Sequence, residues 1–64
     1  MNIQEALSVV VAGENLSRDQ MAEIMHEVMS GEATDAQIGA LLVGLRMKGE
    51  TTEEIAGAAQ VMRD

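Results

Sequence analysis

Three titratable side chains are the first candidates for chemistry in this sequence: His26 and the adjacent Glu53 and Glu54. A histidine can act as a general base, and two carboxylates can share acid–base work, when a pocket positions them. His26 is expected at the edge of the apolar face of a helix, near Glu23 and Ser30 in helical spacing, which indicates a solvated side chain. Glu53 and Glu54 fall at the second and third positions of a helix, where the positive end of the helix dipole accounts for both. We therefore predict no catalytic residue in this chain.

Residue types exclude several kinds of site. The 64 residues include no Cys and one His, which rules out a disulfide, a thiolate site and a conventional zinc site. No glycine-rich phosphate loop is present, because Gly13, Gly31 and Gly49 are expected to end helices. No cofactor or metal site is therefore predicted in the chain itself.

Charge and hydropathy limit the partners. With 11 acidic and 4 basic side chains the formal net charge is −7, and an acidic surface repels nucleic acids and anionic membranes. Residues 1–5 lack the positive start of a targeting segment, and the apolar run 9–12 is far shorter than the ~20 residues that span a bilayer. We expect a cytoplasmic protein with no nucleic-acid or membrane partner.

The composition predicts an all-α chain with a thin core. There is no Phe, Tyr, Trp or Pro, so Leu, Ile, Val, Met and Ala must form the core. No run of alternating apolar and polar residues predicts a strand. A chain of this size buries only about 60% of the surface that it exposes when unfolded, so we expect marginal stability.

Capping boxes predict where four helices begin, because a Ser, Thr or Asn is followed three residues later by Glu or Gln. The four pairs are Asn2 with Glu5, Ser17 with Gln20, Thr34 with Gln37, and Thr51 with Glu54. The loops are short, which predicts that neighbouring helices fold back on one another as hairpins. The expected architecture is a single domain over residues 1–64, a compact four-helix bundle.

The last three caps recur at a constant spacing of 17 residues. This spacing is compatible with a helical repeat array. Helices of about 13 residues with short loops produce the same spacing, and little besides the caps matches between the segments. We favour the second interpretation.

Helical periodicity assigns the apolar residues to an inward face of each helix. The predicted inward residues are Ile3, Ala6, Leu7, Val10 and Val11; Met21, Ile24, Met25, Val28 and Met29; Ile38, Leu41, Leu42 and Leu45; and Ile55, Ala58, Ala59 and Met62. The methionines of the second helix also suit an adaptable binding surface. Because the chain has no aromatic residue to fill its core, we assign them to the core.

The third helix, predicted over residues 35–48, is apolar around nearly its whole circumference. Its second apolar face is formed largely by small residues, which we predict to be an interface: Ala36, Gly39, Ala40, Val43, Gly44 and Met47. Glycine inside a helix costs about 1 kcal/mol relative to Ala, so Gly39 and Gly44 suggest close approach of a partner. For Gly57, in the fourth helix, close helix approach and an incidental small residue stay equally open.

An ordered set of short motifs carries a family resemblance. It comprises Gly-Glu-Ala-Thr at 31–34, Ala-Gln-Ile at 36–38, Leu-Arg-Met-Lys-Gly-Glu-Thr at 45–51 and Glu-Glu-Ile-Ala-Gly-Ala-Ala at 53–59. Together they closely resemble the N-terminal helical domain of the anthranilate phosphoribosyltransferase family. The resemblance runs from the first helix to Arg63 and is strongest from Gly31 onward.

This resemblance implies a parent enzyme that transfers a phosphoribosyl group from phosphoribosyl pyrophosphate to anthranilate, with magnesium, in tryptophan biosynthesis. It implies that the helical domain supports homodimerisation and forms one wall of a hinged cleft against a larger catalytic α/β domain. The family's Gly-Thr-Gly-Gly-Asp loop does not occur in the sequence, and we expect the α/β domain to be absent from this chain. No catalytic, cofactor-binding or metal-binding residue carries over, and we expect the chain alone to be inactive.

Two other functions stay open at this stage. The pyrimidine-nucleoside phosphorylases begin with a similar helical domain, so this chain also fits that family. A stand-alone helical module that binds other proteins through the second or third helix is the alternative of a different class.

Overall fold

The computed structural model describes residues 1–63, and within them the chain forms four helices and no strand. The helices are α1 (Ile3–Val11), α2 (Arg18–Met29), α3 (Asp35–Lys48) and α4 (Thr52–Arg63). The prediction of an all-α, four-helix fold is confirmed.

Local sequence sets the start and end of the helices. The predicted capping boxes at Asn2, Ser17 and Thr34 are all present, each with reciprocal side-chain and backbone hydrogen bonds. Thr51 and Glu54 exchange the same two bonds, at 2.8 and 3.1 Å. After each of the first three helices the chain passes through a glycine with positive φ, as predicted: Gly13, Gly31 and Gly49.

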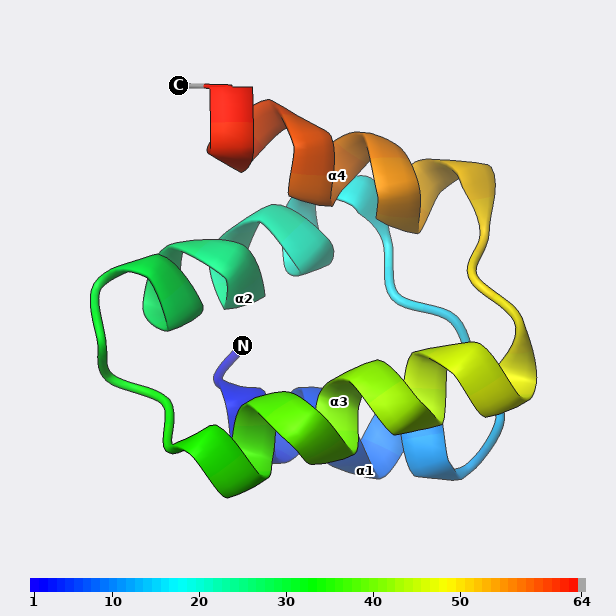
Figure 1. The fold of residues 1–64 in the computed structure, drawn as a ribbon. Helices are drawn as coiled ribbons and strands as arrows, with labels where there is room; N and C mark the ends of the chain where they lie inside the picture. Colours follow the sequence, from blue (N-terminus) through cyan, green and yellow to red (C-terminus); the bar gives the residue numbers. More distant parts are fainter. Residues whose placement is uncertain (64) are drawn as a thin grey trace.

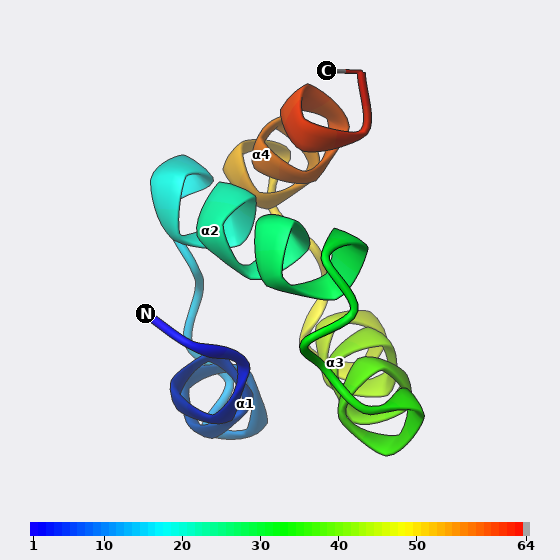
Figure 2. The ribbon, with the colours of Figure 1, turned by 90° about the vertical axis from the view of Figure 1, so that its left-hand side faces the viewer.

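The prediction that helices adjacent in sequence pack on one another as hairpins is wrong. The helices that pack most closely are α2 with α4 and α1 with α3. Within each pair the two helices run the same way, and the two pairs run in opposite directions (Figure 1). Figure 2, which looks along the helices, shows the loops crossing from one pair to the other. Short loops do reverse the chain direction, but each one leads into the other pair.

Small residues allow each pair to approach closely. A Cβ added to Gly57 would collide with the backbone carbonyl oxygen of Arg18, which places the α4 backbone directly against the start of α2. A Cβ added to Gly44 would lie 2.7 Å from Cγ1 of Val10, where α3 meets α1. The choice left open for Gly57 is therefore settled as close helix approach.

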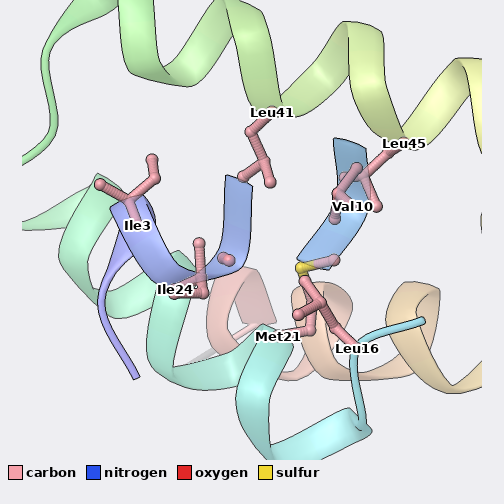
Figure 3. Close-up of a cluster of buried hydrophobic side chains, with 8 residues drawn as sticks. Ile3, Val10, Leu16, Met21, Ile24, Leu41 and Leu45 are labelled. Atoms are coloured by element: carbon pink, nitrogen blue, oxygen red, sulfur yellow. The ribbon is translucent and has the colours of Figure 1, made fainter. Parts of the chain in front are cut away.

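A cluster of buried apolar side chains joins the two pairs. Leu41 and Leu45 point from α3 towards Val10 of α1 and Met21 of α2, and Leu16 enters the same cluster from the α1–α2 loop (Figure 3). The remaining members are Ile3, Ala6 and Ile24. The predicted core is thus confirmed for α1 and α2 in the main.

Five residues predicted to face the core are more than half exposed: Val11, Met29, Leu42, Ile55 and Met62. The error is largest for α4. That helix buries Glu54, Gly57 and Val61. Ile55 and Met62, its two largest side chains predicted to face inward, are exposed. A helix with apolar residues on two sides does not specify by periodicity alone which side is buried.

Candidate functional site

The outer side of α3 is the predicted interface. Ala36, Gly39, Ala40, Val43 and Met47 are all exposed. Nothing lies within 4 Å of a Cβ added at Gly39, so the space above it is open. Gly44 differs from the others because it is half-buried against Val10 of α1. The absence of a side chain at Gly44 is therefore needed for the packing of α3 on α1.

A shallow hollow of about 440 Å³ lies between α1 and α3, and we call it the α1–α3 groove. Its lining is Val10, Val11, Gly13, Ala40, Val43, Gly44, Met47 and Lys48. Sequence reasoning missed the contribution of α1, because Val11 was assigned to the core. Val11 follows Val10 by about 100° around the helix, which puts it at the edge of the buried face, and it is 76% exposed.

A second hollow, of about 370 Å³, lies among α2, α3 and α4, and we call it the α3–α4 groove. Its lining is Met21, Met25, Leu41, Leu42, Leu45, Glu50, Glu54, Ile55, Ala58, Ala59 and Met62. The exposed apolar members, Leu42, Ile55 and Met62, were all predicted to be core. Their exposure creates a second apolar surface that the sequence did not reveal, since each of these residues is also suited to a core position.

A buried ion pair links the last residue of α3, Lys48, to the first turn of α4, at Glu54. Glu54 is 1% exposed, and its Oε1 lies 2.7 Å from Nζ of Lys48, whose side chain is 5% exposed. The backbone N–H of Leu16 donates to Oε2 of Glu54 at 2.7 Å, and that of Thr51 donates to Oε1 at 2.8 Å. Lys48 also donates to Oδ1 of Asn15 and to the carbonyl of Gly49, both at 3.0 Å.

The polar atoms in this cluster are well partnered. Among the described residues no buried side-chain nitrogen or oxygen lacks a hydrogen bond. Burial by itself would raise the pKa of Glu54, but hydrogen bonds from Lys48, Leu16 and Thr51, with the charge of Lys48, outweigh it and lower that pKa. The helix dipole therefore does not account fully for Glu54, because the carboxylate is also buried and bonded to Lys48 and to the backbone of Leu16. The cluster joins the α1–α2 loop to the ends of α3 and α4.

The other candidates for chemistry lie at the surface. His26 is exposed, as predicted. Glu53 pairs with Nε of Arg18 at 3.3 Å, with both side chains more than half exposed. Within residues 1–63 no group of three His, Cys, Asp or Glu side chains is placed to hold a metal ion. Neither His26 nor Glu53 is therefore placed in a pocket that could position it for acid–base chemistry.

Two carboxylates of α2 hold the start of α1. Oε2 of Glu27 accepts a hydrogen bond from the backbone N–H of Ile3 at 3.0 Å. Glu23 lies 3.0 Å from the amino group of Met1 and, by that hydrogen bond and its charge, raises the pKa of the amino group. Both contacts satisfy the positive end of the α1 dipole and link α1 to α2.

None of the described helices is both long and apolar enough to cross a bilayer.

Comparison with known proteins identifies the domain. Residues 4–64 match the family described as "Glycosyl transferase family, helical bundle domain". The chain belongs to this family. It is 64% identical, over all 64 residues, to an anthranilate phosphoribosyltransferase from Teredinibacter turnerae, of which it covers 19%. An anthranilate phosphoribosyltransferase from Syntrophotalea carbinolica is 63% identical over 62 residues, which are 97% of this chain and 18% of that protein. An enzyme of the same name from Saccharophagus degradans is 61% identical over 64 residues, which are all of this chain and 19% of that protein.

The helical bundle domain thus spans about a fifth of the length of the curated relatives that it matches. The residues that carried the resemblance at 45–51 and 53–59 include both members of the buried Lys48–Glu54 pair. In this structure the contacts of these two residues stabilise the fold.

Proposed function

We propose that this chain is the N-terminal helical domain of an anthranilate phosphoribosyltransferase, and that it serves assembly within that enzyme. The observation that carries the proposal is the identity of 61–64% with three enzymes of this name over nearly the whole chain. The parent enzyme would transfer a phosphoribosyl group to anthranilate in tryptophan biosynthesis, a reaction of soluble metabolites that fits a cytoplasmic protein.

The two grooves support a role in docking. Exposed apolar surface in a small acidic domain favours association over solvation. The α3 side of the α1–α3 groove includes Ala40, Val43 and Gly44, and Ala36 and Gly39 adjoin it. These residues are small or short, which allows two helices to approach closely across a two-fold axis. We assign this surface to a second copy of the chain. The α3–α4 groove, with the larger Leu42, Ile55 and Met62, is assigned to the larger domain of the parent.

Catalysis is assigned to that larger domain. The magnesium of the proposed parent needs oxygen ligands brought together in space, and no described residues of this chain form such a group. We therefore expect the 64-residue chain to have no transferase activity by itself. Its contribution would be to hold the parent's subunits and domains in position.

The test is to express the complete coding sequence of the source gene and to measure loss of anthranilate fluorescence with phosphoribosyl pyrophosphate and magnesium. Turnover of anthranilate is expected, and none from the purified 64-residue chain assayed alongside as the matched control. Phosphate-dependent cleavage of thymidine without anthranilate turnover would overturn the proposal in favour of a pyrimidine-nucleoside phosphorylase. Turnover by the 64-residue chain, abolished when magnesium is removed, would refute the assignment of catalysis to the larger domain.

A further inference from the structure

We propose that Met47 is a modification site at which oxidation of the side chain opposes pairing of two copies of the chain, a role that rests on the proposed docking of a second copy at the α1–α3 groove. Met47 lines this groove and is 84% exposed, the largest value for any large apolar side chain among the described residues. Peroxides oxidise methionines that solvent reaches. Met47 is therefore open to this reaction while the chain is unpaired.

The reaction converts the apolar thioether of Met47 into a polar sulfoxide. A hydroperoxide transfers an oxygen atom to the sulfur, so that the O–O bond breaks as the S–O bond forms. The sulfur loses an electron pair to this oxygen, and the remainder of the hydroperoxide leaves as water or an alcohol. The sulfoxide oxygen accepts hydrogen bonds and has no proton to donate. It therefore needs a donor wherever it is buried.

The groove around Met47 has no free side-chain donor for that oxygen. Of the described residues that line the groove, only Lys48 carries a polar group on its side chain. The Lys48 ammonium has three N–H groups, and they donate to Oδ1 of Asn15, the carbonyl of Gly49 and Oε1 of Glu54. Its side chain is also 5% exposed. The buried ion pair thus leaves the groove apolar.

A second copy would not supply the missing donor from its own groove. In an interface with two-fold symmetry both copies contribute the same surface patch, so the apolar lining of one groove meets that of the other. An acceptor buried there without a donor is costly, whereas the unmodified thioether requires none. Oxidised Met47 therefore favours separate chains, in which water bonds the oxygen. Because such coupling is reciprocal, pairing should in turn protect Met47 from peroxide.

The test compares self-association of the 64-residue chain before and after brief treatment with hydrogen peroxide. Sedimentation equilibrium gives the dimer Kd, and peptide mass spectrometry locates the sulfoxides. Oxidation of the original chain should raise the dimer Kd by at least about tenfold. In Met47→Leu, which has no thioether at this site, the ratio of Kd after and before peroxide should be about one. Met29→Leu is the matched control and should keep the full effect, because Met29 is 64% exposed and lines neither groove.

A second pair of variants tests polarity without an oxidant. Met47→Gln places a polar group of similar length in the groove and should raise the dimer Kd in the same direction as the sulfoxide. Met29→Gln makes the same change outside the grooves and should not raise it. Because both methionines are exposed, both variants should keep the helical circular dichroism.

The outcomes separate this role of Met47 from the proposed pairing itself. An unchanged Kd in the chain oxidised at Met47, or in Met47→Gln, would overturn the role of Met47 and leave the pairing in place. A rise in Kd of peroxide-treated Met47→Leu equal to that of the original chain would overturn it as well, since another methionine would be responsible. A chain that is monomeric before oxidation would overturn both the role of Met47 and the assignment of the α1–α3 groove to a second copy.

Discussion

Glycine-to-alanine substitution should have opposite effects at two interior helix positions, Gly57 and Gly39. Alanine favours a helix by about 1 kcal/mol over glycine at either site. At Gly39 the added methyl group meets nothing within 4 Å, so the full gain should appear. At Gly57 it would collide with the carbonyl oxygen of Arg18 and lie 3.1 Å from Cβ of Met21. The first of these neighbours is backbone, which cannot rotate away.

The magnitude at Gly57 follows from two opposing terms. Overpacking a well-packed contact costs about 1–3 kcal/mol, and moving a backbone carbonyl belongs at the upper end of that range. After the helix-propensity gain of about 1 kcal/mol is subtracted, Gly57→Ala should destabilise the domain by about 1–2 kcal/mol. Gly44→Ala should fall between the two, because the Val10 methyl group that it meets at 2.7 Å can adopt another rotamer.

Thermal unfolding followed by circular dichroism at 222 nm measures these differences. For a domain of 60–100 residues, 1 kcal/mol shifts Tm by about 4–8 °C. Gly39→Ala should raise Tm by about that amount, and Gly57→Ala should lower it by about 4–16 °C. Each melt should be repeated at two protein concentrations, so that any contribution from self-association is separated. A rise in Tm for Gly57→Ala similar to that for Gly39→Ala would refute the close packing of α4 on α2.

Three further predictions concern the buried pair and the surfaces of α3. Lys48→Ala alone should destabilise the domain in urea by about 3–5 kcal/mol, because it leaves the buried Glu54 without its cation, whereas Arg18→Ala should cost about 0–1 kcal/mol; similar losses for the two variants would contradict the structure. Since the pKa of Glu54 is lowered in the folded state, its contribution to stability is present above the ordinary value of 4.5 and is lost as pH falls through the lowered pKa. Glu54→Gln should remove this part of the pH dependence, and an unchanged acid unfolding profile would argue against it. Val43→Asp, on the exposed side of α3, should keep the helical spectrum and reduce self-association in analytical ultracentrifugation, while Leu41→Ala in the core should cost about 2–5 kcal/mol. Unfolding of Val43→Asp would show that this side of α3 is core.

The helix ends were predictable because their causes are local. Each cap is formed by a side chain and a backbone group three residues apart, as in Ser17 with Gln20, and no distant residue is needed. The exposed His26 and the exposed outer side of α3 at Val43 and Met47 were likewise anticipated. These features require only the helical period and the capping pattern.

The buried face of each helix was less predictable. Leu42, Ile55 and Met62 have the residue types and spacing of core positions, yet they are exposed. Glu54 has the position of an N-terminal surface carboxylate, yet it is buried. In both cases the outcome depends on partners far away in sequence, which periodicity does not describe.

The sequence by itself determined that this protein is helical, where its helices begin and end, that it is acidic, and to which family it belongs. Only the tertiary structure decided that α1 pairs with α3 and α2 with α4, and which apolar side chains remain outside. The physical reason is the range of the interactions. Capping and periodicity act within a few residues. The close contact of Gly57 with Arg18 and the hydrogen bond from Leu16 to Glu54 join segments that only folding brings together.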